Sequence, residues 1–439
     1  MPKQIMIGIF FLLCTSHAPA DNHFLPGGIE QLEAVNQRIV NIDTEELEQL
    51  IKEEPSLVII DVRNEDEVNV RGGMIDGRRE LIVPRGWLEF RIENEVADKN
   101  TPIVVYCGIN QRSPLAADTL QNMGYTNVKN YADGFFSWKE KNNPVKFTDH
   151  ALDSLLFRKP EKVTDRVWSA IGATAPGTYT NSGHNNNLSF VIGDDSVMVF
   201  NAGDNYLLAK AFHEEIRKIT KLPISAVILE NGQGHAMLGS SYWQDQGVPV
   251  MAHVDTANEI HEYGHEVIER MRRRNGEKAR HTRLTLPDKT FVDKMIIDLG
   301  GIEVELLYLG PAHSPGDIVA WIPAENLVIS GDMAFHQRLL PLFEHTDSAA
   351  WIDTWEKFAA LNATIVVPGH GDPTDMAEVT RYTRDYLIDL RQMIAEVIDN
   401  DGDLQQAYEV DQSAYAHLDT FHELATLNAD RVFRAMEFE

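Results

Sequence analysis

The sequence predicts an α/β protein built from two successive domains, on three observations. Its 439 residues are enough for two ordinary hydrophobic cores. In the first third of the chain, short β-rich runs alternate with helical patterns, which is typical of a parallel sheet with helices on both faces. Beyond residue 163 the pattern changes to a hairpin followed by a longer series of strands and helices.

The composition is that of a globular protein with an acidic surface. Apolar residues make up 43% of the chain and charged residues 24%. There are 67 acidic and 39 basic residues, which gives a formal net charge of −28. Such a surface repels nucleic acids and anionic membranes, so we expect neither to be a partner of the mature protein.

The first twenty residues have the pattern of a cleaved signal peptide. Lys3 supplies a positive charge, residues 5–13 form a short apolar run, and Ala18-Pro19-Ala20 offers a small-x-small cleavage pattern. The run is too short to span a bilayer unless it is extended, which favours cleavage after Ala20 over a retained anchor. We therefore expect a periplasmic or secreted protein, with residues 21–38 as a leader into the first domain.

The elements of the first domain place a cysteine at a reactive position. They are a helix at residues 44–53, strands at 57–60 and 103–106, and a helix at 113–123. Ser113 and Pro114 are typical of a helix start, and Gly124 is typical of a residue just past a helix end. Cys107 thus lies at the mouth of a helix, where unpaired backbone N–H groups and the helix dipole favour the thiolate.

Two further observations favour a reactive thiol over the alternative, a buried structural cysteine. Gly108, Asn110, Gln111 and Arg112 are poor core neighbours, and the arginine offers a positive charge to an anionic substrate. Cleavage would also remove Cys14, so the mature chain would have no cysteine with which to form an internal disulfide.

Residues 39–146 resemble a rhodanese domain. The resemblance rests on Asp61-Val62-Arg63, Pro84-Arg85-Gly86, the Cys-x4-Arg loop and Gly134-Phe135-Phe136-Ser137-Trp138. It implies that Cys107 takes a sulfane sulfur from an anionic donor and holds it as a persulfide. It also implies that Arg112 recognises the donor. The loop backbone that would cradle the persulfide consists of Gly108, Ile109, Asn110, Gln111 and Ser113.

After a linker at residues 147–162, the second domain brings polar residues to successive strand ends. The expected strands are 188–192, 196–200, 224–229, 304–309, 318–322, 327–330 and 364–367, with helices at 206–220 and 260–274. The turn 193–195 marks the first two strands as a hairpin. His313, Asp332 and His370 each follow one of the later strands within a glycine-containing signature. Such a set of nitrogen and oxygen ligands predicts a metal site.

Residues 163–439 resemble the metallo-β-lactamase fold, which implies a four-layer αββα sandwich. By this resemblance His313, Asp332 and His370 fall on metal-ligand positions. The family's first motif, His-x-His-x-Asp-His, is replaced here by Asn231, Gln233, His235 and Ala236. Because amides are weak ligands and alanine is none, the sequence predicts one divalent ion, zinc or iron, held by His235, His313, Asp332 and His370. Asn231 and Gln233 would hydrogen-bond a water or the substrate.

The sequence therefore predicts a sulfur-handling protein that acts on small sulfane-sulfur or thiol substrates. A rhodanese-type sulfurtransferase centred on Cys107 would be joined to a hydrolase-like domain with a reduced metal site, or with none. A persulfide dioxygenase-like enzyme is the first alternative. The second is a sulfur carrier without catalytic activity, and the oligomeric state stays open.

Overall fold

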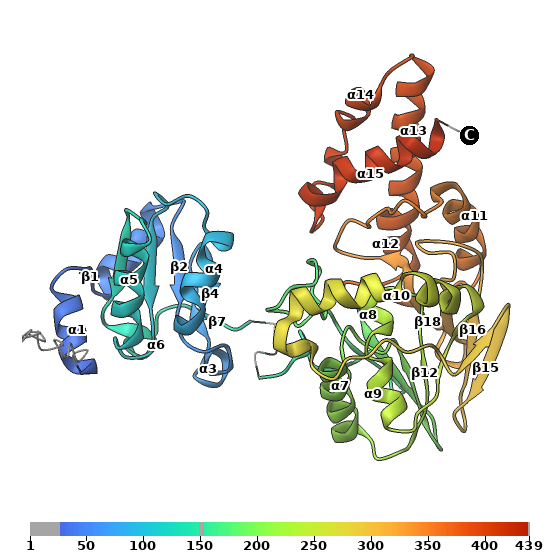
Figure 1. Cartoon of the computed structure of the whole chain (residues 1–439), viewed down its shortest axis with the longest axis horizontal. Helices are drawn as coiled ribbons and strands as arrows, with labels where there is room; N and C mark the ends of the chain where they lie inside the picture. The colour runs from blue at the N-terminus through green and yellow to red at the C-terminus, as the bar shows by residue number, and fades with distance from the viewer. Residues whose placement is uncertain (1–26, 149–150, 152, 438–439) are drawn as a thin grey trace, which may run out of the picture. The chain divides into compact units, whose positions relative to one another are not determined.

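The computed structural model describes residues 27–148, 151 and 153–437, and these form two compact units. The first unit extends to Phe147 and the second begins at Thr148; Figure 1 follows the chain through both by colour. The predicted signal peptide at 1–20 and residues 21–26 of the predicted leader lie outside the described residues, whereas residues 28–36 of that leader form a helix. Among the described residues, no helix is long and apolar enough to cross a membrane.

The first unit contains the predicted parallel sheet. Its five strands are in the order β1-β6-β5-β2-β4, and every neighbouring pair is parallel. The strands are β1 (Val40–Ile42), β2 (Val58–Asp61), β4 (Arg79–Ile82), β5 (Ile103–Tyr106) and β6 (Val128–Tyr131). A separate antiparallel pair joins β3 (Met74–Ile75) to β7 (Val145–Lys146). Because all strands of the five-stranded sheet are parallel, the carboxyl ends of β2, β4 and β5 lie at the same end of that sheet.

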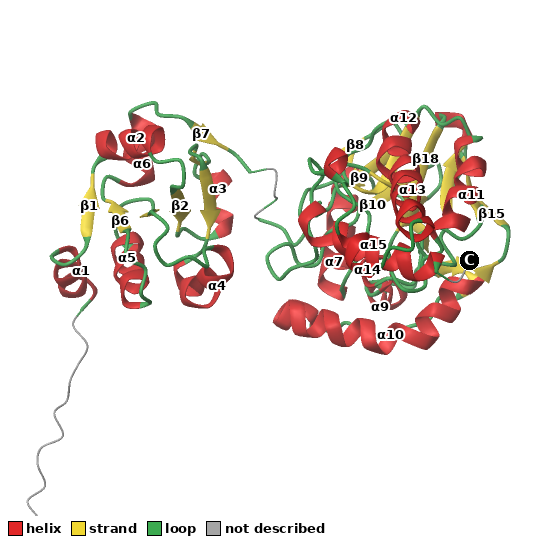
Figure 2. Cartoon of the chain, turned by 90° about the horizontal axis from the view of Figure 1, so that it is seen from above, coloured by secondary structure: helices red, strands yellow, loops and turns green. Residues whose placement is uncertain are grey.

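Helices cover both faces of this sheet because its central strands are apolar on both sides. In β5, Val105 packs into one core and Val104 into the other. Helices α1, α4 and α5 lie on the first face, and α2 and α6 lie on the second (Figure 2). The helices are α1 (Gly28–Asn36), α2 (Thr44–Glu53), α3 (Glu65–Val70), α4 (Leu88–Glu95), α5 (Arg112–Asn122) and α6 (Gly134–Glu140).

The second unit is built on two sheets. The first has seven strands in the order β14-β13-β12-β11-β10-β9-β8, and the second has five in the order β15-β16-β17-β18-β19. The strands of the first are β8 (Glu161–Lys162), β9 (Val167–Ala170), β10 (Leu188–Ile192), β11 (Val197–Phe200), β12 (Ile224–Ile228), β13 (Val250–His253) and β14 (Lys289–Phe291). Those of the second are β15 (Lys294–Asp298), β16 (Glu303–Leu307), β17 (Val319–Ile322), β18 (Leu327–Phe335) and β19 (Ile365–His370).

Three separate cores divide this unit into four layers, as expected for an αββα sandwich. In β11, Val197 and Val199 face a core shared with helices, whereas Met198 and Phe200 face the core between the two sheets. The third core lies between the second sheet and the C-terminal helices. The helices on the first sheet are α7 (Tyr206–Ile219), α8 (Gly234–Met237), α9 (Ser240–Asp245) and α10 (Val254–Asn275). Those on the second are α11 (Ser348–Ala359), α12 (Met376–Thr380), α13 (Tyr386–Asp399), α14 (Leu404–Tyr408) and α15 (Phe421–Met436).

Several elements differ from the sequence-based expectation. Strand β18 continues past the predicted end at Ser330, so Asp332 lies inside a strand rather than after it. The extension runs beside β19 and pairs with it, and the last pair joins Phe335 of β18 to His370 of β19. Strand β8 lies within the segment predicted as a linker and pairs with β9. Its pairing depends on a partner strand in the second unit, which local sequence does not reveal.

Candidate functional sites

Cys107 follows β5 directly, and hydrogen-bond donors surround its buried sulfur. The Gln111 N–H donates to Sγ at 3.3 Å, and the Ser113 hydroxyl lies 3.5 Å from it. Helix α5 begins at Arg112 with Gln111 as its N-cap, one residue before the start predicted at Ser113. Ser113 instead lies in the first turn, where its hydroxyl is directed at the thiol.

These donors act against burial in setting the acidity of the thiol. Burial raises the pKa of Cys107, but the Ser113 hydroxyl and the amides of Ser113, Arg112 and Gln111 lower it, and the net pKa is lower than usual. The site therefore favours a thiolate, the nucleophilic form of cysteine.

The loop that follows Cys107 is held by neighbouring elements. The Phe135 N–H, at the start of α6, donates to the Cys107 carbonyl at 2.8 Å. Asn110 has a φ of +57°, a conformation that asparagine tolerates, and the Asn130 amide donates to its side-chain oxygen at 2.8 Å. The loop is thus fixed from β6 and α6, and Ile109 is exposed beyond it.

Arg112 is paired with an acidic residue at this site. Its guanidinium forms a two-point ion pair with Glu67 of α3, with Nη1–Oε2 at 2.6 Å and Nη2–Oε1 at 3.0 Å. The hydrogen bonds from Arg112 outweigh burial and hold the pKa of Glu67 below its usual value. Sequence reasoning missed Glu67. The only available signal was an acidic residue in the short helix after β2.

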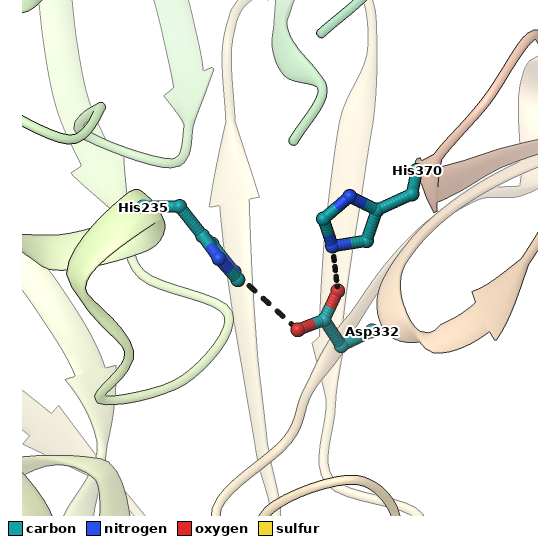
Figure 3. A group of neighbouring side chains, drawn as sticks. All are labelled: His235, Asp332 and His370. Carbon is teal, nitrogen blue, oxygen red and sulfur yellow. Dashed lines mark ion pairs between the residues drawn. The ribbon is translucent and has the colours of Figure 1, made fainter. Parts of the chain in front are cut away.

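A second group of side chains gathers in the second unit (Figure 3). His235 from α8, Asp332 from β18 and His370 from the end of β19 bring ligand atoms within 4.8 Å of one another. His235 Nε2 lies 3.3 Å from Asp332 Oδ2, and His370 Nε2 lies 3.2 Å from Asp332 Oδ1. All three side chains are largely buried.

His313 lies beside this group rather than within it. Its Nδ1 is 3.5 Å from Asp332 Oδ2 and 2.6 Å from the side-chain nitrogen of Gln233. The two predicted amides thus contact the cluster through hydrogen bonds. Asn231 donates to Asp332 Oδ2 at 3.2 Å and to Asp317 Oδ1 at 3.0 Å. The side-chain nitrogen of Asn231, and not its oxygen, therefore faces the two carboxylates, so Asn231 offers no ligand atom to a metal ion in this arrangement.

The hydrogen bonds of His370 suit it to bind a cation. Its Nδ1 bonds the Asn185 carbonyl, which requires a proton on Nδ1 and leaves a lone pair on Nε2. That lone pair faces Asp332 Oδ1, which is buried and has no hydrogen-bond partner among the described residues. Two acceptors 3.2 Å apart repel each other unless a proton or a metal cation lies between them. The His/Asp/His cluster could therefore hold a metal ion.

The pKa directions of the cluster reflect its burial and its charges. Burial lowers the pKa of His235, but Asp332 and Glu230 raise it more, to about 10. Burial dominates at His313 and His370 and lowers the pKa of each to about 4. These two imidazoles are therefore neutral at pH 7 and able to act as ligands.

Three buried charged residues near the cluster were absent from the predicted set. Glu230 Oε1 lies 3.2 Å from His235 Nε2, and Asp317 accepts the bond from Asn231. Arg338, which is 5% exposed, directs Nη1 toward His370 Nδ1 at 3.3 Å. Asp317 and Glu230 occur in the glycine-rich loops that the sequence singled out, whereas nothing in the sequence distinguished Arg338.

Comparisons with known proteins agree with this description. The family described as rhodanese-like domain matches residues 43–141, and the metallo-beta-lactamase superfamily matches residues 238–370. The chain joins a rhodanese-like domain to a metallo-β-lactamase-like domain. The match to the second family begins just after the segment that carries Asn231, Gln233 and His235.

Relatives resemble one domain or the other. A metallo-beta-lactamase type 2 from Bacteroides fragilis is 33% identical over 24% of this chain and 44% of its own length. A linear primary-alkylsulfatase from a Pseudomonas species is 30% identical over 23% of this chain and 20% of its own length. A putative mitochondrial thiosulfate sulfurtransferase from Schizosaccharomyces pombe is 32% identical over 20% of this chain and 66% of its own length. The chain thus spans between one fifth and two thirds of these relatives.

Proposed function

We propose that the rhodanese-like domain is a sulfurtransferase that forms a persulfide on Cys107. The observation that carries this proposal is the pair of hydrogen-bond donors directed at the Cys107 Sγ, the Gln111 amide and the Ser113 hydroxyl. The likeness to a putative thiosulfate sulfurtransferase supports thiosulfate as a first donor to test.

In the first half-reaction, the Cys107 thiolate attacks the outer sulfur of the donor. A new S–S bond forms at Cys107, the donor's own S–S bond breaks, and sulfite leaves with the bonding electron pair when thiosulfate is the donor. The Gln111 amide and the Ser113 hydroxyl then stabilise the negative charge of the persulfide. An acceptor thiolate attacks the outer sulfur in the second half-reaction and releases the Cys107 thiolate.

Intact-mass spectrometry of the full chain incubated with thiosulfate or a small persulfide tests this proposal. We expect one added sulfur that cyanide or thiols remove, its loss in Cys107→Ser, and its retention in Cys14→Ser. An adduct that survives Cys107→Ser, or its absence from the unchanged protein with every sulfane donor, would contradict the proposal.

We propose, second, that the metallo-β-lactamase-like domain is a hydrolase with one divalent ion, zinc or iron. His235, Asp332 and His370 would hold this ion, and the buried acceptor pair Asp332 Oδ1 and His370 Nε2 carries the proposal. Such an ion, when bound, supplies a Lewis acid and a water of lowered pKa. His313 and Gln233 would border the space for the substrate, since they bond each other beside Asp332.

Elemental analysis of the full chain purified without added metal tests this second role. We expect close to one ion per chain, and none in Asp332→Ala. A metal content near zero that persists after dialysis against zinc, iron or manganese would instead favour the sulfur carrier. A ferrous ion with oxygen-dependent persulfide consumption would favour the dioxygenase-like alternative.

We also propose that the protein acts in the periplasm or outside the cell. The charged start, the apolar run and the Ala18-Pro19-Ala20 pattern of the sequence support this location.

A further inference from the structure

Glu230 and Asp332 converge on a single nitrogen atom of the cluster. Glu230 lies two residues past β12 and its side chain is fully buried. Its Oε1 is 3.2 Å from His235 Nε2, and Asp332 Oδ2 is 3.3 Å from the same atom. An imidazole nitrogen can donate one proton, so it fully satisfies at most one of these carboxylates.

The position of Glu230 is fixed by its backbone and by a neighbouring glycine. Its N–H donates to Asn201 Oδ1 at 3.1 Å, and its carbonyl accepts from the Ile318 N–H at 3.1 Å. Its Oε2 lies against Gly331, where any Cβ would overlap it, and Gly331 has a φ of +54°. The glycine thus makes room for this carboxylate directly beside Asp332.

The second oxygen of Glu230 has no partner among the described residues. Oε2 is buried and accepts no hydrogen bond there, as is also true of Asp332 Oδ1. A buried carboxylate oxygen that accepts no hydrogen bond is energetically costly. Both unpartnered oxygens belong to the residues that contact His235.

The cluster also gathers three buried carboxyl groups. Glu230, Asp317 and Asp332 are at most 1% exposed, and within 4.0 Å their only basic partners among the described residues are imidazoles. Arg338 is the buried guanidinium nearby, and it contacts His370 rather than a carboxylate. Three buried carboxyl groups thus lie close together with a single guanidinium nearby, an arrangement that a bound divalent cation would stabilise.

We propose that Glu230 is a further ligand of the ion held by His235, Asp332 and His370. This inference rests on the proposed metal site. A set of two imidazoles and two carboxylates is harder than a histidine-rich one, so it favours oxygen-preferring ions such as manganese(II) and iron(II) relative to zinc. Because a carboxylate would take the place of an imidazole in the ligand set, we expect this site to prefer manganese(II) or iron(II) more than a histidine-rich site does.

Titration of the metal-free full chain with manganese(II), followed by loss of the free-ion electron paramagnetic resonance signal, tests the inference. We expect one bound manganese per chain, and at least about tenfold weaker binding in Glu230→Gln. Zinc affinity, measured by competition with a chromophoric chelator, should fall less. The matched control is Glu396→Gln, the same change on an exposed face of α13, which should leave both affinities unchanged.

The outcomes separate this inference from the proposed metal site itself. If the unchanged protein binds one ion and Glu230→Gln binds both metals equally well, Glu230 is no ligand although the site stands. An equal loss for both metals would also contradict the inference, because it would indicate that Glu230 only orients His235. If the unchanged protein binds no ion, both proposals fail. Should Glu230→Gln not fold, Glu230→Asp keeps the charge with a shorter side chain and is expected to weaken manganese binding more than zinc.

Discussion

Arg112 and Glu67 form a two-point ion pair at the entrance to the Cys107 loop. The guanidinium expected to recognise an anionic donor is thus already bound by a carboxylate of α3. Because both side chains are partly exposed, the pair is a weak interaction that a donor anion can compete with. We therefore expect Glu67 to limit how strongly Arg112 attracts an anionic donor.

Glu67→Gln should strengthen the binding of anionic donors. Removing the carboxylate frees Arg112, and an exposed pair contributes about 0.2–1 kcal/mol, so we expect the KM for thiosulfate to fall up to about fivefold. Arg112→Ala should raise this KM by about tenfold or more. An uncharged trisulfide donor serves as the control, with a KM that neither change alters. Unaltered thiosulfate kinetics in both variants would show that Arg112 does not contact the donor.

The Cys107 thiol should ionise at a lower pH than a free cysteine, whose pKa is about 8.5. Because its pKa is lowered, the thiolate fraction at neutral pH is raised, and alkylation by iodoacetamide should reach half its maximal rate below that pH. Ser113→Ala removes the hydroxyl donor and should move the midpoint of the alkylation rate to higher pH. Peptide mass spectrometry at Cys107 gives the rates, and Ser137→Ala is the control. A downward shift in Ser113→Ala would contradict the role of the hydroxyl.

Substitutions in the metal cluster should have graded effects. Asp332→Ala and His370→Ala should abolish metal binding, and His235→Ala should weaken it strongly, because these residues bring their ligand atoms together. Asn231→Ala should keep one ion per chain but lower its affinity by about 10- to 100-fold, since Asn231 donates to Asp332. Calorimetric titration with zinc measures these affinities. Equal losses in Asn231→Ala and Asp332→Ala would contradict this order.

Restoring histidines at two positions should increase the capacity of the site. Asn231→His combined with Gln233→His places imidazoles beside His313, which Gln233 now hydrogen-bonds at 2.6 Å. We expect metal content to rise from one ion per chain toward two, because three imidazoles make a good zinc site. Elemental analysis gives the stoichiometry. A content that stays at one would indicate that Ala236 and the missing aspartate also limit the second site.

Cleavage of the N-terminal segment should leave Asp21 as the first residue. The expectation follows from the apolar run and the Ala18-Pro19-Ala20 pattern alone. N-terminal sequencing of the protein from its native host, with cell fractionation, provides the measurement. Retention of Met1, or a lipid on Cys14, would contradict it.

Local sequence patterns predicted most strands and helices of both domains, and the family resemblance implied how those of the second domain form four layers. Alternating apolar residues specify which strand faces are buried, and caps and glycines limit the helices, so α2 and β5 have the bounds that the sequence predicted. Cys107 at the end of β5 was predictable for the same reason. Elements whose existence depends on a distant partner were missed or shortened, as the end of β18 beside β19 and the pairing of β8 show.

The sequence by itself determined that chemistry-bearing residues occur in glycine-containing signatures near the predicted strand ends, because these signatures are local features. Only the tertiary structure decided which of them meet. Glu67 contacts Arg112 across 45 positions of sequence, and Glu230 reaches His235 and Asp332 at a site where Gly331 leaves room. Charge compensation between buried groups is a property of three-dimensional packing, so no local pattern reveals that Asn231 donates to Asp332 or that Arg338 lies behind His370.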